Sequence, residues 1–261
     1  MEIRMLERNK EAGKLSFILK GSTPAFANAL RRLITEEVPV MAIEDVEFRK
    51  NNSILYDEMI AQRLGLIPLT TDIKSYNLPQ KCKCKGEGCA RCRLKMTLKA
   101  KGPAMVYASD IKSKDSAIKP VHPKLPIVKL LKGQDIEIEA TAMLGQGKEH
   151  MKWSPGLVYY KYKPSIELGN VKNPEAVVEA CPVNIFELKE GKLIINKDKL
   201  LSCHLCEACV DADEGIKLNC DNTEFVFYVE SWGQLDPKKM VIEAAKLFEE
   251  QLDELASDIA K

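Results

Sequence analysis

Two groups of cysteines constrain the fold of this chain more than any other feature of its sequence. The groups are Cys82, Cys84, Cys89 and Cys92, and then Cys181, Cys203, Cys206, Cys209 and Cys220. The first 14 residues are charged throughout and lack the apolar core of a signal peptide, so we expect a cytoplasmic, reducing environment. In that environment cysteines in such number favour metal ligation or redox chemistry over disulfides.

The second group carries an iron–sulfur pattern. Cys203, Cys206 and Cys209 form C-x2-C-x2-C, which presents three thiolates from one tight loop. Cys181 precedes a proline, and a remote Cys-Pro commonly supplies the fourth ligand of a [4Fe–4S] cluster. The sequence therefore predicts one cluster on these four cysteines. Cys206 is the least secure ligand, because a [3Fe–4S] cluster needs only three thiolates.

The same spacing permits a comparison with bacterial ferredoxins. Each of their two C-x2-C-x2-C-x3-C-P motifs gives its fourth cysteine to the other cluster. Here the remaining ligand positions hold Val171, Pro174, Val177 and Asp213. All four would serve one cluster, so the segment resembles a two-cluster ferredoxin that kept one site and lost the other. Disulfides or free thiols are the alternative, and we expect the leftover Cys220 to be buried or disulfide-bonded.

The first group reads C-x-C-x4-C-x2-C, with glycines between its two cysteine pairs. Four thiolates suit one tetrahedral Zn²⁺ and leave no open position, so Cys82, Cys84, Cys89 and Cys92 predict a structural zinc site. Reduced thiols without metal are the alternative. Residues 81–101 also carry eight Lys or Arg and one acidic residue. This basic patch could contact nucleic acid, meet an acidic partner, or offset the charge of the thiolates.

The length of 261 residues suggests about two domains, and apolar patterns predict both helices and strands. The expected elements are a hairpin over 1–20, helices over 22–38, 57–69 and 236–261, and strands over 136–140 and 225–230. The last helix carries an apolar stripe of Val241, Ala245, Phe248, Leu252, Leu255 and Ile259. Such a stripe fits either packing on the chain's own core or a helix–helix dimer seam.

Signs of catalysis are weak. The chain has three histidines and no P-loop, dinucleotide-binding or Ser-His-Asp pattern. Asp211 and Asp213 have a spacing used by magnesium sites, but with no phosphate-binding loop nearby we interpret them as a solvated turn. A net charge of +1 argues against a surface devoted to nucleic acid, and no apolar stretch approaches the ~18 residues of a membrane span.

Two further segments carry a family resemblance. Residues 26–48, FANALRRLITEEVPVMAIEDVEF, resemble the alpha motif of RNA polymerase assembly subunits. Residues 57–69, DEMIAQRLGLIPL, resemble its companion segment. The resemblance runs through the whole chain and is nearest to the archaeal branch of this alpha-like, third-largest-subunit family. The loop at 82–92 resembles the zinc loop of the eukaryotic branch.

That resemblance implies an α+β fold with three parts. A discontinuous alpha-like dimerisation domain, residues 1–40 plus 221–261, would receive two insertions. The first, 41–165, would be a mainly-β domain carrying the zinc loop, and the second, 166–220, a ferredoxin-like iron–sulfur domain.

The resemblance also implies a function. The chain would form an obligate heterodimer with a small alpha-like partner, subunit L, through the helices at 22–38 and 236–261. This heterodimer would nucleate assembly of the large catalytic subunits and small zinc subunits of an archaeal DNA-directed RNA polymerase. The chain would then be a non-catalytic part of a nucleotidyltransferase and would meet DNA only indirectly. A ferredoxin-type redox protein and a free zinc-dependent nucleic-acid-binding protein are the alternative classes.

Overall fold

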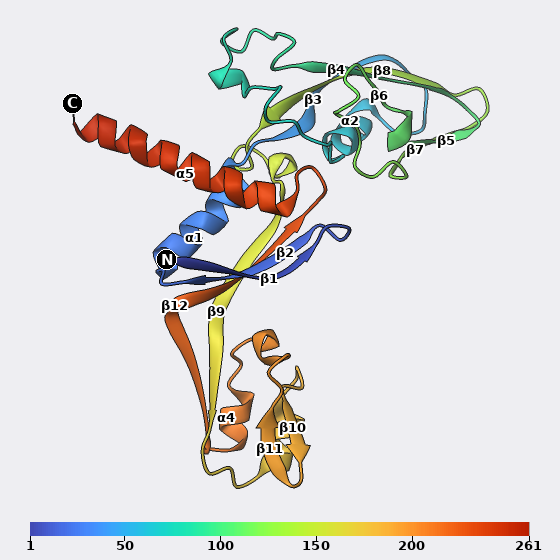
Figure 1. Ribbon diagram of the computed structural model, residues 1–261. Helices are drawn as coiled ribbons and strands as arrows, with labels where there is room; N and C mark the ends of the chain where they lie inside the picture. The colour runs from blue at the N-terminus through green and yellow to red at the C-terminus, as the bar shows by residue number, and fades with distance from the viewer. Residues whose placement is uncertain (261) are drawn as a thin grey trace. The chain divides into compact units, whose positions relative to one another are not determined.

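The computed structural model describes residues 1–260, which fall into two compact units (Figure 1). The first unit comprises Met1–Arg8, Ser16–Ala29 and Tyr159–Tyr228. The second comprises Asn9–Leu15, Leu30–Val158 and the chain from Val229 onward. Both units are therefore assembled from segments that are distant in the sequence.

The first unit is built on a four-stranded sheet with the order β1-β2-β12-β9. The strands are β1 (Glu2–Asn9), β2 (Lys14–Lys20), β9 (Gly156–Leu168) and β12 (Ile216–Ser231). The hairpin predicted over 1–20 is confirmed. The strand predicted over 225–230 is the end of β12, which begins nine residues earlier, at Ile216.

Aromatic side chains form the core of this sheet. Phe17 of β2 stacks on Phe227 of β12 with ring centroids 5.0 Å apart, and Tyr160 of β9 stacks on the same ring at 5.2 Å. Phe225 and Phe227 are fully buried. Stacked aromatic pairs add to the free energy gained by burying their area, so these rings fix β2, β9 and β12 as neighbours.

A small module lies between β9 and β12 in the chain. Its elements are α3 (Pro174–Ala180), β10 (Phe186–Lys189), β11 (Lys192–Ile195) and α4 (Ala208–Ala212). β10 and β11 pair antiparallel, with Phe186 opposite Ile195. Buried residues of the module's core are Val177, Ile185, Phe186, Ile216 and the cysteines Cys181, Cys203 and Cys209. A core this small has little apolar area with which to stabilise the module.

The helix predicted over 22–38 begins as α1 (Pro24–Arg32) and continues as a π-helical segment, Leu33–Glu37. The predicted cap is confirmed, because the Thr23 hydroxyl accepts a hydrogen bond from the backbone N–H of Phe26 at 3.2 Å. The π-helical ending, which the sequence did not predict, closes with Val38 N–H donating to the Leu33 carbonyl at 3.1 Å.

The second unit contains a four-stranded sheet with the order β3-β8-β4-β6. Its strands are β3 (Val40–Asn51), β4 (Leu94–Lys101), β6 (Lys112–Ser113) and β8 (Asp135–Gly145), all paired antiparallel. The pair β5 (Ala104–Tyr107) and β7 (Pro126–Leu130) forms a second, smaller sheet. The strand predicted over 136–140 lies inside β8, whereas β3 was not predicted because its first four residues are all buried and do not alternate.

One face of the larger sheet is apolar and the other is charged. The helix α2 (Asp57–Gly65) contacts β3 and places Ile60 and Leu64 in the same core as Met96 and Ile138. The predicted helix over 57–69 thus ends at Gly65, as its glycine and later proline indicate. Strand residues that face the other way carry cross-strand ion pairs, and this alternation is typical of an antiparallel sheet with one buried face.

The final helix, α5 (Pro237–Ile259), is capped by Asp236, whose carboxylate accepts from the Lys238 N–H at 2.9 Å. It packs against the Leu33–Glu37 segment and buries Met240 and Ala244 completely. The chain therefore combines helices with mostly antiparallel sheets, as expected. Within residues 1–260 no helix is both long and apolar enough to cross a bilayer.

Candidate metal centres

The first cysteine group forms a compact loop between the short helical turn Pro79–Lys81 and β4. Backbone N–H groups of Lys85 and Cys92 close two tight turns by donating to the carbonyls of Cys82 and Cys89, at 2.9 and 3.0 Å. Gly88, between the two cysteine pairs, has a φ of +104°, a left-handed value at which side-chain-bearing residues are strained. The glycines noted in the sequence therefore let the loop fold back so that its cysteine pairs meet.

The four thiols meet with the spacing of a single tetrahedral ion. All four Sγ atoms lie within 4.8 Å of one another. The Sγ–Sγ distances are 3.6 Å for Cys82–Cys89, 3.5 Å for Cys84–Cys92 and 3.8 Å for Cys89–Cys92. Zn–S bonds of about 2.3 Å in a tetrahedron place sulfur atoms about 3.8 Å apart. This arrangement can hold a metal ion.

The pKa values of two of these thiols are shifted in opposite directions by their surroundings. A hydrogen bond from the Gly88 backbone, assisted by the thiols of Cys82 and Cys92, lowers the pKa of Cys84 to about 6. Burial raises the pKa of Cys92 to about 12. Cys84 thus offers a thiolate at neutral pH, whereas Cys92 must lose its proton when a metal binds, and binding would release protons.

The basic patch at 81–101 is partly neutralised within its own domain. Lys95 and Lys99 form ion pairs with Glu139 and Glu137 of β8, and Arg93 lies 4.0 Å from Asp45. Cross-strand pairs of this kind stabilise the exposed sheet face only slightly, but they reduce the local positive charge. The patch is therefore weaker as a nucleic-acid surface than its composition suggests.

The predicted iron–sulfur ligands also lie together. Cys181, Cys203, Cys206 and Cys209 all line one small cavity, whose walls include Ile166, Val183, Ile185, Phe186 and Leu218. Three of the four thiols are buried, and Cys206, the ligand expected to be least secure, is exposed. An apolar cavity with cysteines on its wall is the environment that an iron–sulfur cluster requires.

The C-x2-C-x2-C loop has an unusual backbone conformation next to its cysteines. Leu205 and Glu207 both adopt left-handed conformations, with φ of +59° and +62°, which non-glycine residues rarely do. The Leu205 N–H also points at the Cys203 Sγ at 3.5 Å. Burial, together with the neighbouring thiols of Cys203, Cys181 and Cys206, raises the pKa of Cys209.

These four thiols are more widely spaced than those of the first group. Among residues 1–260, no three of them have Sγ atoms that all lie within 4.8 Å of one another. A cube of four iron and four sulfur atoms is larger than one ion, so wider spacing suits a cluster better than a single Zn²⁺. The residues present therefore fit the expected group.

The positions that would ligate a second cluster in the ferredoxin spacing take part in packing and hydrogen bonding. Val177 is fully buried and Val171 packs against the same core. Asp213 is buried as well, with a carboxylate that accepts from the N–H groups of Lys172 and Asn173 at 2.7 Å each and from Gly215 at 2.8 Å. These hydrogen bonds hold the pKa of Asp213 below its usual range.

Two sequence interpretations are corrected here. Asp213 is not part of a solvated turn, because it closes the start of α3, forty residues earlier in the chain. Asp211, two residues before it, is exposed. The leftover Cys220 is exposed and unpaired, neither buried nor disulfide-bonded as expected, since it lies in the polar first half of β12.

The apolar stripe of the last helix is only partly covered by the chain itself. The fully buried Met240 and Ala244 each lie one residue before a stripe position, whereas the stripe residues Val241 and Phe248 are half-buried and Ala245 is exposed. In its second half Leu252, Leu255 and Ile259 are 50%, 56% and 79% exposed. Three large apolar residues exposed along one helix face are typical of a surface that pairs with another chain.

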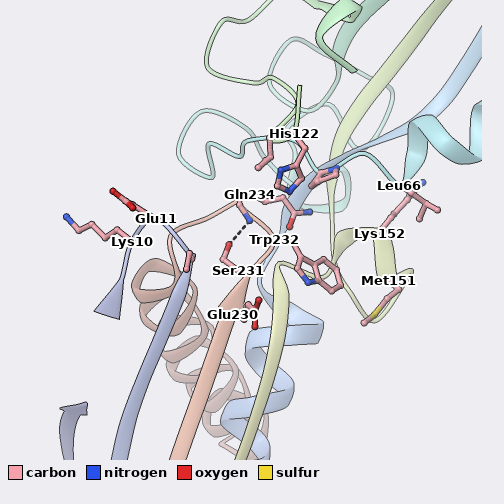
Figure 2. A pocket seen from close by; sticks show the side chains of 15 residues that line it. Lys10, Glu11, Leu66, His122, Met151, Lys152, Glu230, Ser231, Trp232 and Gln234 are labelled. Carbon is pink, nitrogen blue, oxygen red and sulfur yellow. Dashed lines mark hydrogen bonds between the residues drawn. The ribbon is translucent and has the colours of Figure 1, made fainter. Parts of the chain in front are cut away.

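A pocket of about 660 Å³ in the second unit lacks a catalytic arrangement (Figure 2). His122, Trp232 and Gln234 line it together with apolar residues. The hydroxyl of Ser231, also in its wall, donates to the Leu235 carbonyl at 2.5 Å and accepts from the Gly233 N–H at 2.9 Å. That hydroxyl serves the turn after β12 and is not poised as a nucleophile beside a base.

Comparisons with known proteins agree with these features. A family model described as the RNA polymerase Rpb3/RpoA insert domain matches residues 46–156. The chain is 39% identical to DNA-directed RNA polymerase subunit Rpo3 of Methanosarcina mazei, covering 98% of this chain and 97% of that protein. The chain belongs to the Rpo3 family. Identity to the Rpo3 proteins of Methanosphaera stadtmanae and Thermococcus kodakarensis is 36% in each case, over 95% and 100% of this chain and 95% and 98% of those proteins.

Membership of the Rpo3 family confirms the resemblance found in the sequence. Members of this family are alpha-like subunits of DNA-directed RNA polymerase. The full-length similarity therefore favours the polymerase-subunit family over the alternatives of a free ferredoxin and a free zinc-dependent nucleic-acid-binding protein. The segment matched by the insert-domain family contains the four-cysteine loop but not the small module between β9 and β12.

Proposed function

We propose that this chain is the assembly platform of an archaeal RNA polymerase and acts as an obligate heterodimer with a small alpha-like subunit, subunit L. The observation that carries the proposal is full-length similarity to Rpo3 proteins combined with an unburied apolar face on α5. A helix that exposes Leu252, Leu255 and Ile259 gains free energy when a second apolar helix covers it. Pairing of this kind comes first, and the large catalytic subunits and small zinc subunits then dock on the pair.

In this proposal the domains divide as the resemblance implies. Residues 1–40 plus 221–261 form the dimerisation domain, 41–165 the insert domain with the zinc loop, and 166–220 the ferredoxin-like domain. Contact with DNA is indirect, and the chain works in the cytoplasm. Phosphodiester formation occurs in the large subunits. This chain therefore positions other subunits of the nucleotidyltransferase and takes no part in the reaction itself.

Both metal groups have structural roles in the proposal. Cys82, Cys84, Cys89 and Cys92 hold one Zn²⁺, supported by their Sγ spacing of 3.5–3.8 Å. Cys181, Cys203, Cys206 and Cys209 hold one [4Fe–4S] cluster, or a [3Fe–4S] cluster if the exposed Cys206 is not a ligand. Metal–thiolate bonds would supply the stability that the small core of the 166–220 module lacks.

Affinity purification of the tagged chain from its native cell extract tests the proposal. We expect the small alpha-like subunit to elute with the chain in a 1:1 ratio, together with the large polymerase subunits. Metal analysis of the recombinant chain, purified alone and without oxygen, should give one zinc and three or four irons per chain. Recovery of the chain alone, or only with a flavin-containing reductase, would contradict the assembly role.

A further inference from the structure

Lys161 of β9 is a cation whose partners are not carboxylates. Its ammonium donates to the backbone carbonyl of Cys203 at 2.8 Å and lies 5.6 Å from the centre of the Tyr228 ring. Within residues 1–260, no Asp or Glu oxygen comes within ion-pair distance of this ammonium. The side chain is half-buried, so water balances its charge only in part.

The neighbouring Lys163, unlike Lys161, is paired with a carboxylate. Lys163 lies two residues further along β9 and therefore on the same face as Lys161. It forms an ion pair with Glu224 of β12, which also lies 3.8 Å from Lys20. No comparable acid faces Lys161, whose environment instead contains the thiol of Cys203.

A second side chain of the sheet holds the same cysteine loop. The Tyr228 hydroxyl of β12 donates to the carbonyl of Leu201 at 3.3 Å, and its ring stacks on Tyr159 of β9 with centroids 4.9 Å apart. Lys161 and Tyr228 thus reach from two strands to carbonyls at positions 201 and 203. The loop that carries the first cysteine of C-x2-C-x2-C is anchored to the sheet at two points.

We propose that Lys161 is a positioning residue for the iron–sulfur site, holding the Cys203 backbone in place and setting a positive charge beside the cysteine thiolates. This inference rests on the ligand set given under the proposed function. Four thiolates give an iron–sulfur centre a net negative charge, which an adjacent cation in partly buried surroundings stabilises. The reduced state carries one more electron than the oxidised state, so Lys161 favours it more. Lys161 therefore slows iron loss and raises the reduction potential.

Three variants of the full chain separate charge from hydrogen bonding. Lys161→Met removes both, Lys161→Gln keeps a donor without the charge, and Lys161→Arg keeps both. Lys163→Met is the matched control, because it removes a cation from the same face of the same strand that is already paired with Glu224. Each protein is purified without oxygen. The readouts are iron per chain, the rate of iron transfer to a chelator, and the reduction potential followed by electron paramagnetic resonance.

We expect iron loss to the chelator to become several-fold faster in the Met and Gln variants and to stay near wild type in the Arg and Lys163→Met variants. At a given potential the ratio of reduced to oxidised cluster should fall about tenfold without the charge, equivalent to about 59 mV for a one-electron couple. If Lys161→Met does not fold, the comparison of Gln with Arg still isolates the effect of the charge, because both side chains keep a donor.

Two results would overturn the inference. One is a reduction potential and iron-transfer rate in Lys161→Gln equal to those of wild type. The other is an equal effect of Lys163→Met, which would indicate general weakening of the sheet. Wild-type protein that is well folded yet holds no iron–sulfur cluster would instead contradict the proposed ligand set itself, so the two failures are distinguishable.

Discussion

The Asp213 carboxylate accepts a hydrogen bond from the backbone N–H of Asn173 at 2.7 Å. In the two-cluster ferredoxin spacing, position 213 would hold a cysteine that ligates iron. Here a carboxylate occupies it and binds the unpaired N–H groups at the start of α3, which a helix N-terminus favours. This position is therefore occupied by a hydrogen-bonded acid in a module whose core also contains the buried Val177, while Cys181, Cys203, Cys206 and Cys209 line a separate small cavity.

This replacement predicts a pH-dependent contribution to stability. Asp213→Asn should lower the melting temperature of the 166–220 module at pH 7, because an amide cannot accept from three N–H groups as a carboxylate does. The native pKa of Asp213 is lowered, so its contribution is present above the ordinary aspartate pKa of about 3.9 and is lost as pH falls through the native value. Differential scanning calorimetry from pH 7 to pH 3 should therefore show wild type and variant converging on acidification. Asp211→Asn, at the exposed neighbouring acid, is the control, and an equal effect there would contradict the assignment.

The exposed half of α5 predicts the effect of a charge at the pairing surface. Leu252→Asp should abolish co-elution with the small alpha-like subunit, since losing a central apolar contact costs about 2–4 kcal/mol, or roughly 30- to 900-fold in affinity. Ser257→Asp places the same charge about 160° around the helix from Leu255 and should leave pairing intact. Size-exclusion chromatography of the co-expressed chains measures both. Normal yield of the Leu252→Asp heterodimer would remove α5 from the interface.

The four-cysteine loop predicts a local effect of metal loss. Cys82→Ser and Cys89→Ser should each lose the single zinc, loosening residues 81–93 while the core around Ile60 and Met96 stays folded. Elemental analysis and limited proteolysis measure the two effects. Cys220→Ser, at an exposed thiol outside both groups, should keep its zinc. Carefully purified wild type without zinc would count against the site.

The second cysteine group predicts that its module depends on its metal. Cys203→Ser should lose the cluster and unfold residues 166–220, because seven buried residues, three of them cysteines, form most of that core. The dimerisation sheet keeps its own stacked aromatic core, so pairing with the small partner should persist while docking of the large subunits weakens. Iron content, heterodimer yield and polymerase assembly yield test this in one series. Loss of pairing as well would indicate that the module and the sheet fold as one.

A structural cluster also predicts insensitivity to its redox state. Transcription by the fully assembled wild-type polymerase should not change when the cluster is reversibly reduced by one electron. Run-off transcription at controlled potential, with assembly checked by native electrophoresis, is the measurement. A reversible change in activity with the assembly intact would favour a redox switch over a structural role.

The amino-acid sequence determined the features that depend on neighbours a few residues away. Spacing alone identified both cysteine groups, because a loop of fixed length can bring only certain positions to one ion or cluster. Thr23 and Gly65 marked a helix start and a helix end through local hydrogen bonds and backbone preference. The ambiguity of the α5 stripe was also genuine, since periodicity reports that a face is apolar and not what covers it.

Tertiary structure decided the features that depend on residues far apart in the chain. The burial of Asp213 follows from contact with a helix start forty residues away, and the length of β12 follows from its neighbours in the sheet. Lys161 and Cys203 are 42 residues apart in the chain, so no local sequence pattern indicates that they are in contact. Packing likewise buried Met240 and Ala244 near the start of α5 and left Leu252, Leu255 and Ile259 exposed near its end. Local patterns fix conformation over a few residues, whereas burial and charge balance depend on which distant groups the fold brings together.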